Sequence, residues 1–233
     1  MMVRAVLFDL FETLVTESRN RPPGVSSLAA EFGCEGAAFR AEWRKRRPHV
    51  TTGRLSFGDA LGAIASTLGQ PADGAMLRRA CDERIRRKQE SISLVEPQIL
   101  AMLDELRTRG VRLGLVSNCF AEDVAGWPTC PLRARFDCVV FSFEVGLAKP
   151  DPLIYLEATR RLQIDAAECW FVGDDADGEL AGAAQADLRA FRAVWFLTRW
   201  PHFVEGAGAV ASVVSCEELL HMVQESRPAI DDR

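Results

Sequence analysis

The sequence predicts an α/β fold: a Rossmann-like core built on a parallel sheet, with an inserted α-helical cap domain. Two observations lead to this prediction. Short runs of consecutive apolar residues alternate with stretches of helical periodicity, as expected for a parallel sheet covered on both faces. One long segment near the N-terminus has helical periodicity only. The 233 residues, 48% apolar and 26% charged, have the composition of a globular protein, which excludes disordered, collagen-like and coiled-coil chains.

Five apolar runs are predicted strands, and each ends in polar or turn residues. They are residues 3–9, 111–118, 138–143, 169–174 and 190–196. Helical spacing predicts helices over 97–109, where Pro97 starts the first turn and Gly110 follows the end, and over 152–162, which Pro152 opens in the same way. Right-handed crossovers between parallel strands would place such helices on both faces of the sheet.

The segment from about residue 16 to residue 93 breaks this alternation. Its amphipathic stretches predict helices over 26–32, 37–47, 57–68 and 75–90. We therefore expect a core domain of residues 1–15 and 94–233 and a helical cap domain of residues 16–93. Residues 17–92 hold 14 Lys and Arg against 9 Asp and Glu, whereas the rest of the chain is acidic. This asymmetry indicates that one part handles an anion and the other hosts a cation.

Several classes of protein are excluded or disfavoured. No apolar run reaches the roughly 20 residues of a membrane span, and the N-terminus lacks the pattern of a signal peptide, so we expect a cytoplasmic protein. The formal net charge of −5 disfavours nucleic acid as a partner. The seven cysteines show no metal-ligand spacing, which disfavours a zinc site. Because their number is odd, they are expected to be reduced thiols rather than a disulfide framework. The oligomeric state is left open, and the residues after Arg227 are expected to be a frayed tail.

Polar side chains stand where the predicted strands end, which is where ligands bind in open parallel sheets. Asp9 closes the first strand, Ser117 and Asn118 close the second, Lys149 lies in the loop after the third, and Asp174 closes the fourth. A carboxylate such as Asp9 is ionised at neutral pH and can act as a nucleophile without a partner base. Such a group and a phosphate repel each other unless cations intervene, and Lys149 and a divalent metal are the natural counter-charges.

Four motifs carry a family resemblance. They are FDLFETL at 8–14, VSN at 116–118, LAKPDP at 147–152 and VGDD at 172–175, and GELAGA at 178–183 adds support. With these motifs the chain resembles the haloacid dehalogenase-like (HAD) hydrolase superfamily, from residue 3 to about residue 190. The helical insertion lies where that family places its cap domain. The resemblance implies an enzyme, a hydrolase of the phosphatase type, whose substrate is a small phosphorylated metabolite.

The resemblance and the chemistry of the side chains together assign roles. Asp9 would take the phosphoryl group as an aspartyl-phosphate, with Lys149 as a catalytic counter-charge. Thr13, Ser117 and Asn118 would hold the phosphate oxygens. Mg²⁺, which prefers hard oxygen ligands, would be held by three groups: the carboxylate of Asp9, the backbone carbonyl of Phe11 and the carboxylate of Asp174.

Neighbouring acidic residues are harder to assign. Asp174 and Asp175 stand side by side and repel each other, which favours a metal or another cation nearby. Whether Asp175 or Glu179 supports that metal is left open. Asp177 is expected to be solvated.

Position 11 departs from the family pattern. Phosphatases of this superfamily carry a proton-transferring aspartate two residues after the nucleophile, and here that residue is Phe11. General acid–base help is typically worth about 10²–10⁴-fold in rate, so Glu12 is a candidate replacement. An aromatic residue at position 11, together with Tyr155, is also similar to metal-independent 2-haloacid dehalogenases. A weakly active scaffold that binds a phosphorylated ligand or a partner is the third alternative.

Basic residues crowd one part of the insertion. They are Arg44, Lys45, Arg46, Arg47 and Arg54. We expect at least one of them to reach the substrate and most to be surface charges. Trp43 is expected to pack in the core or in the cap rather than to stack on a ligand.

Overall fold

The computed structural model describes residues 2–18, 24–200 and 210–226. Its centre is one parallel sheet of six strands in the order β3-β2-β1-β4-β5-β6. The strands are β1 Ala5–Phe8, β2 Arg112–Ser117, β3 Cys138–Phe141, β4 Cys169–Gly173, β5 Arg189–Ala193 and β6 Ser212–Val213. The predicted α/β parallel-sheet fold and its five strands are confirmed. The two-residue β6 was not predicted, because it is too short for a periodic pattern.

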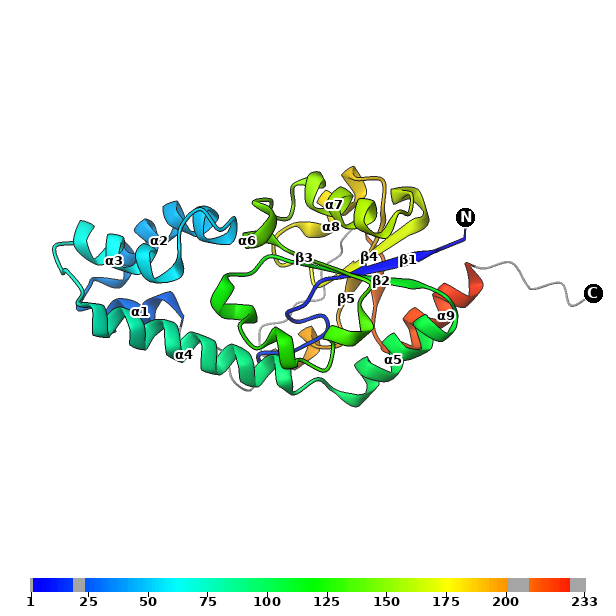
Figure 1. The fold of residues 1–233 in the computed structure, drawn as a ribbon, viewed down its shortest axis with the longest axis horizontal. Coiled ribbons are helices and arrows are strands. Elements are labelled where there is room, and N and C mark those ends of the chain that lie inside the picture. The colour runs from blue at the N-terminus through cyan, green and yellow to red at the C-terminus, as the bar shows by residue number, and fades with distance from the viewer. Residues whose placement is uncertain (1, 19–23, 201–209, 227–233) are drawn as a thin grey trace, which may run out of the picture.

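Helices cover both faces of the sheet (Figure 1). On one face lie α5 (Pro97–Thr108) and α9 (Cys216–Glu225), and on the other lie α7 (Pro152–Leu162) and α8 (Glu179–Gln185). Successive residues of β1 point to opposite faces: Val6 packs in the cluster that includes α5 and α9, and Leu7 in the one that includes α7 and α8. This two-sided burial explains why the strands are continuously apolar.

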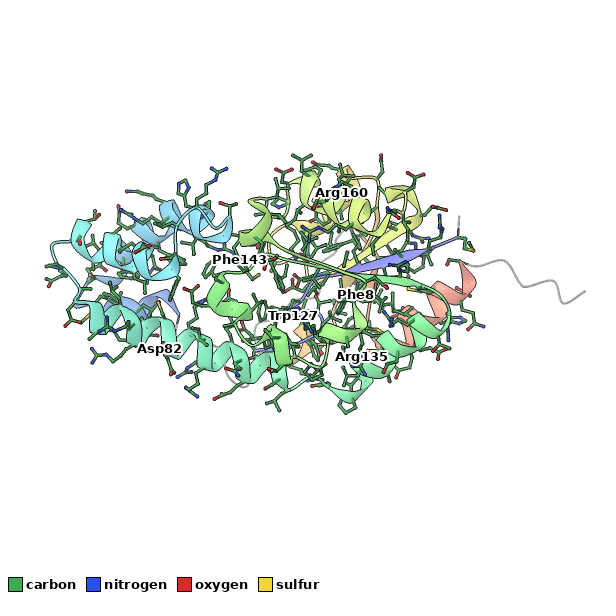
Figure 2. The ribbon with its side chains drawn as sticks, viewed as in Figure 1. Phe8, Asp82, Trp127, Arg135, Phe143 and Arg160 are labelled. Carbon is green, nitrogen blue, oxygen red and sulfur yellow. The ribbon has the colours of Figure 1, made fainter. Side chains whose placement is uncertain are left out.

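Large apolar side chains lie in the interior and charged side chains project from the surface helices (Figure 2). Phe8 of β1 and Trp127 lie in the interior of one core cluster, whereas Arg160 of α7 projects into solvent. All seven cysteines are free thiols, as expected. No helix within the described residues is both long and apolar enough to cross a membrane. The tail predicted after Arg227 lies outside the described residues.

Between β1 and α5 the chain forms four helices that lie to one side of the sheet (Figure 1). These are α1 Val25–Glu31, α2 Gly36–Thr51, α3 Phe57–Thr67 and α4 Gly74–Ser93. They share a separate apolar cluster, which includes Phe39 of α2 and Ile64 of α3. Helix α2 runs four residues beyond its predicted end and contains Pro48, because packing of Val50 and Thr51 extends it. Helix α4 reaches back from this cluster to the sheet.

The strand order brings together the residues that follow β1, β2 and β4. β1 lies between β2 and β4, and Phe8 is level with Leu115 of β2 and Val172 of β4. The chain therefore leaves the sheet at one edge after all three strands. The residues that come directly after these three strands therefore lie close together at this edge, although they are more than 50 positions apart in the sequence.

The close packing of α8 against the backbone of Pro150 can be tested at Gly182. A Cβ atom at this position would lie 2.1 Å from the carbonyl oxygen of Pro150, which is backbone and cannot swing away. We expect Gly182→Ala to lower the free energy of unfolding by about 1–3 kcal/mol, measured by urea denaturation. The control is Gly62→Ala in α3, where the nearest atom is a flexible Leu77 methyl at 3.4 Å. It should be neutral or slightly stabilising; equal losses in both variants would contradict this account.

Candidate active site

Asp9 is the first residue after β1, and the sheet itself fixes its backbone. The Asp9 amide donates to the carbonyl of Val172 on β4 at 2.9 Å. The side chain is buried, with 6% of the residue exposed, and one carboxylate oxygen pairs with the ammonium of Lys149. A buried carboxylate requires such a partner, because burial of an unpaired charge is very unfavourable.

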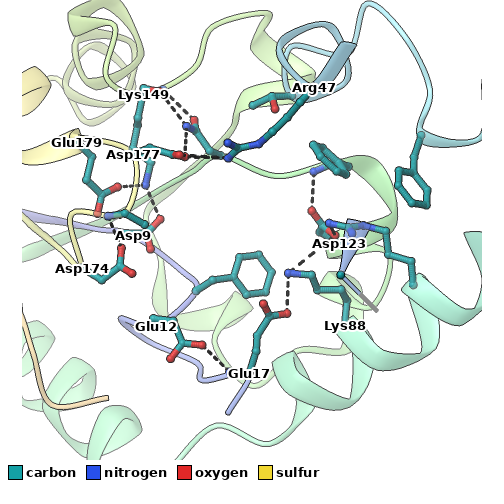
Figure 3. A pocket seen from close by; sticks show the side chains of 18 of the residues that line it. Asp9, Glu12, Glu17, Arg47, Lys88, Asp123, Lys149, Asp174, Asp177 and Glu179 are labelled. Carbon is teal, nitrogen blue, oxygen red and sulfur yellow. Dashed lines mark hydrogen bonds and ion pairs between the residues drawn. The ribbon is translucent and has the colours of Figure 1, made fainter. Parts of the chain in front are cut away.

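Lys149 lies between two carboxylates, those of Asp9 and Glu179 (Figure 3). Burial alone would lower the pKa of Lys149, but the negative charges of Asp9 and Glu179 outweigh it and raise that pKa above its usual value. The ammonium therefore stays charged at any pH at which the protein works. Asn118 holds the backbone on either side of this side chain: it accepts from the Lys149 amide at 2.8 Å and donates to the Lys149 carbonyl at 2.9 Å.

Glu179 begins α8 and fits because β4 ends in glycine. A Cβ atom on Gly173 would lie 2.0 Å from Oε1 of Glu179, so only glycine leaves room for this carboxylate. The hydroxyl of buried Tyr155 donates to the Glu179 carbonyl at 2.7 Å and fixes the start of the helix. Burial raises the pKa of the Glu179 carboxyl, and the charge of Lys149 opposes that rise.

Asp174 completes a group of three acidic residues. One oxygen each from Asp9, Asp174 and Glu179 lie within 4.8 Å of one another, close enough to hold a single metal ion. Burial, and then the charge of Asp9, raise the pKa of Asp174 to about 7. Asp175, the other residue left open as a metal ligand, is instead exposed and accepts from the amide of Leu180 at 3.3 Å. The geometry therefore brings Glu179, rather than Asp175, to the carboxylates.

Thr13 and Ser117 are fully buried, yet their hydroxyl oxygens have no hydrogen-bond partner within the described part of the chain. Buried hydroxyls are normally paired, so the lack of a partner at these two groups is unusual. Neither residue lines the cavity described below. Asn118, the third residue predicted to hold phosphate, has both of its donors and its carbonyl oxygen engaged, because its amide also donates to Asp177 at 3.0 Å. In this structure these bonds hold the backbone of Lys149.

A cavity of about 390 Å³ opens above the carboxylates, and both the sheet and the helical insertion line it. Of the basic residues singled out in the insertion, Arg47 lines it, whereas Lys45 and Arg46 pair with Glu42. Arg47 pairs with Asp177 at 3.1 Å. The expectation that Asp177 is solvated is therefore wrong: it is half-buried, and despite its burial Asn118 and Arg47 lower its pKa.

Aromatic rings form the wall of the cavity on the insertion side. Trp43 packs edge-on against Phe57 and Phe120, at centroid distances of 5.8 and 5.9 Å. Phe11 also lines the cavity, and the ammonium of Lys88 lies 3.6 Å from the centroid of its ring. Trp43 therefore packs against other aromatic rings, one in the insertion and one outside it, and it also lines the cavity.

Four charged residues of the cavity were not predicted from the sequence. They are Glu17, Arg84, Lys88 and Asp123. One signal was available, because Arg84 and Lys88 are four residues apart on a predicted helix and so share one face. Their acidic partners come from distant parts of the chain, which no local pattern reveals.

Comparison with known proteins gives the family. A model of haloacid dehalogenase-like hydrolases matches residues 3–187. A phosphoserine phosphatase of Thermus thermophilus is 34% identical over 225 residues, covering 83% of this chain and 88% of that protein. A glyceraldehyde 3-phosphate phosphatase of Methanopyrus kandleri is 35% identical over 99 residues, 41% of this chain and 42% of that protein. The chain thus spans less than half the length of this second relative.

Solved structures with a similar fold include both catalytic types of the family. A HAD phosphatase from Thermococcus onnurineus matches with a TM-score of 0.62 and 21% identity, over 95% of this chain and 98% of that one. An L-2-haloacid dehalogenase from Xanthobacter autotrophicus matches with a TM-score of 0.60 and 20% identity, over 96% and 99%. Identities this low support the fold alone. The family model and the phosphoserine phosphatase relative show that the chain belongs to the haloacid dehalogenase-like hydrolases, a family of enzymes.

Proposed function

We propose that this hydrolase is a Mg²⁺-dependent phosphatase that acts on a small phosphorylated metabolite through an aspartyl-phosphate intermediate. One observation carries the proposal: three buried carboxylates, of Asp9, Asp174 and Glu179, converge on a point beside a single ammonium, that of Lys149. The names of the phosphatase relatives support it.

The charge of the cavity supports a metal. Seven acidic and four basic side chains line it, so its formal charge is −3. A phosphate dianion would be repelled from such a cavity unless a cation were present. The donor set fits Mg²⁺, because Asp9 and Asp174 offer hard carboxylate oxygens, and the Phe11 carbonyl is the third proposed ligand. When bound, Mg²⁺ would supply the positive charge that neutralises the transferred phosphoryl group.

The remaining side chains then have distinct proposed roles. Asp9 attacks phosphorus as the nucleophile, and Lys149 keeps its carboxylate in place and stabilises the charge that develops. The free hydroxyls of Thr13 and Ser117 donate to the phosphate oxygens. Asn118 positions Lys149 through its backbone.

We propose residues 16–93 as a cap domain over a core of residues 1–15 and 94–233. Three of the contacts that join the two parts at the cavity are the pair of Arg47 with Asp177, the pair of Arg84 with Asp123, and the hydrogen bond that the Ser142 hydroxyl donates to the Thr51 carbonyl at 2.7 Å. Opening of these contacts would admit the substrate, and closure would exclude water. We also propose a cytoplasmic location, in keeping with the reduced cysteines.

The group that transfers protons differs from the usual aspartate, because position 11 is Phe. Glu12 lines the cavity, and its carboxylate accepts from Thr16 at 2.9 Å, from the Glu17 amide at 2.8 Å and from Trp200 at 2.8 Å. These three bonds hold the Glu12 carboxylate firmly. We propose Glu12 as the replacement acid and base; unchanged turnover of an alkyl phosphate by Glu12→Gln would exclude it.

The alternative with an observation in its favour is a 2-haloacid dehalogenase. An aromatic ring two residues after the nucleophile suits departure of a halide, which needs no proton, and the dehalogenase fold is similar. The carboxylates of Asp174 and Glu179 weigh against it, because they would repel the carboxylate of a haloacid. A scaffold that only binds its ligand would leave the Asp9–Lys149 pair without a use.

The assay that separates these functions uses p-nitrophenyl phosphate and 2-chloropropionate, each with Mg²⁺ or with a chelator. We expect release of phosphate that depends on Mg²⁺ and no release of chloride. Asp9→Asn should lower phosphate release at least about a thousandfold, because it removes the nucleophile. Asp187→Asn, an exposed site with φ of 64°, is the matched control and should behave as the wild type. Chloride release that is indifferent to the chelator would establish the dehalogenase instead.

A pH dependence of stability follows from the pKa of Asp174. Its value of about 7 in the folded protein exceeds that of an unfolded aspartate, about 4, so the folded state keeps a proton that the unfolded state loses. Stability of the chelator-treated protein should therefore fall as pH rises from 4 to 7, on the order of 2 kcal/mol more than in Asp174→Asn. Urea denaturation at several pH values measures this difference.

The same experiment with Mg²⁺ tests the metal site. Mg²⁺ should restore the stability of the wild type at pH 8 and have little effect on Asp174→Asn. Asp175→Asn is the matched control, because its side chain is exposed and asparagine tolerates its φ of 71°. Mg²⁺ should stabilise Asp175→Asn as much as it stabilises the wild type. Equal stabilisation of Asp174→Asn by Mg²⁺ would contradict the assignment.

A further inference from the structure

Lysines are few in this chain, and two of them are buried at the same cavity. The sequence has 25 arginines but three lysines, Lys45, Lys88 and Lys149. The Lys45 side chain is 69% exposed, whereas those of Lys88 and Lys149 are 7% and 2% exposed and line the same cavity. Buried lysines are rare, because removing an ammonium from water is unfavourable. Lys149 belongs to the site of Asp9, so Lys88 requires a separate explanation.

Lys88 belongs to a cluster on the insertion side of the cavity, which we call the leaving-group subsite: Glu17, Arg84, Lys88 and Asp123. Arg84 and Lys88 stand one turn apart on α4 and both line the cavity. Figure 3 shows Lys88 beside Glu17 and Asp123. Lys88 pairs with Glu17 at 2.6 Å, and Arg84 pairs with Asp123 at 2.6 Å. The cluster thus contains two cations and two anions, with no net charge.

The donors of the subsite exceed its acceptors. Asp123 uses one oxygen for Arg84 and accepts with the other from the Phe120 amide at 2.9 Å. Arg84 Nε is buried and has no hydrogen-bond partner among the described residues. Glu17 Oε1 and Asp123 Oδ1 are also without a hydrogen bond there, but each lies 2.6 Å from a cation of the cluster. The Lys88 ammonium has three donors, and beyond Glu17 its next carboxylate, Asp123, is 4.0 Å away. The donors of the subsite that remain unpaired could therefore bind a further acceptor, such as an anion.

Aromatic rings hold the two cations without neutralising them. The Lys88 ammonium lies over the face of Phe11, and the Arg84 guanidinium lies 4.9 Å from the Phe57 centroid and 4.6 Å from that of Phe120. Phe11 is two residues from Asp9, so the ring that supports Lys88 borders the nucleophile. A ligand bound at Asp9 would extend past this ring toward Lys88.

We propose that Lys88, with Arg84, binds a carboxylate on the alcohol part of the substrate, so that the protein hydrolyses phosphomonoesters of hydroxy acids. This inference rests on the proposed phosphatase function. A carboxylate brings one negative charge to a cluster that is neutral overall. A second phosphate would bring two, and would meet the carboxylates of Glu17 and Asp123.

Four phosphate esters test the proposal by adding one charge at a time. They are ethyl phosphate with neither group, phosphoethanolamine with an ammonium, phosphoglycolate with a carboxylate, and phosphoserine with both. We expect the carboxylate to raise kcat/KM about tenfold or more, for phosphoglycolate over ethyl phosphate and for phosphoserine over phosphoethanolamine. Lys88→Met should bring both ratios close to one. Lys45→Met, at the exposed lysine, should keep them.

Comparing the same esters in wild type and variant cancels the intrinsic reactivity of their leaving groups. Ratios near one in the wild type, or wild-type ratios in Lys88→Met, would overturn the proposal. A preference for the ammonium alone would also overturn it, since Glu17 and Asp123 would then be the binding groups. If p-nitrophenyl phosphate and all four esters are inert, the phosphatase function itself fails.

A second measurement does not require Lys88→Met to fold or the enzyme to turn over. With three lysines, a protein labelled with ¹³Cε-lysine gives three NMR signals, which Lys45→Arg and Lys88→Arg assign. In the Asp9→Asn background, phosphoglycolate should shift the Lys88 signal, and ethyl phosphate should not. A Lys88 signal that phosphoglycolate leaves in place would refute the carboxylate subsite.

Discussion

The position of Lys149 between Asp9 and Glu179 is the interaction on which the rest of the site depends. Two buried carboxylates at the edge of the sheet would repel each other, and the ammonium between them makes their burial tolerable. Each feature around it serves this placement: Gly173 leaves room for Glu179, and Asn118 holds the Lys149 backbone from both sides. Burial and the charge of Asp9 raise the pKa of the neighbouring Asp174 to about 7, and a metal ion held by these carboxylates would favour its charged form.

The helical insertion contributes the other half of the cavity, and its chemistry is different. The sheet edge supplies carboxylates and one lysine around the nucleophile. The insertion supplies aromatic rings, three cations (Arg47, Arg84 and Lys88) and the carboxylate of Glu17, which pairs with Lys88. The partners of the other two cations, Asp177 for Arg47 and Asp123 for Arg84, lie outside the insertion. Under the proposed function, this division would place the reaction at the sheet edge and leave the recognition of the substrate to the insertion. It also gives a physical meaning to the basic insertion within an acidic chain.

Most of the fold could be predicted from the sequence, because burial on both faces leaves a strong signal in each of β1 to β5. The helix α9 had a signal as well, since Ser215 caps it, but no helix was predicted there. The residues at the strand ends, such as Asp9 and Asp174, follow from the rule that parallel strands end at one edge. Glu17 and Asp123 could not be found in this way, because their importance lies in pairing with α4, and pairing between distant segments has no local pattern. The same reason explains the error at Asp177, whose partner Arg47 is 130 residues away.

The proposed mechanism requires above all that the carboxylate of Asp9 becomes covalently bonded to phosphorus. The most direct measurement is to quench the working enzyme in acid, reduce it with borohydride, and sequence its peptides by mass spectrometry. Borohydride converts an acyl-phosphate to an alcohol, so the account predicts homoserine at position 9 in the presence of substrate only. An enzyme that turns over its phosphate ester while position 9 remains aspartate, or in which another side chain is reduced instead, would contradict it.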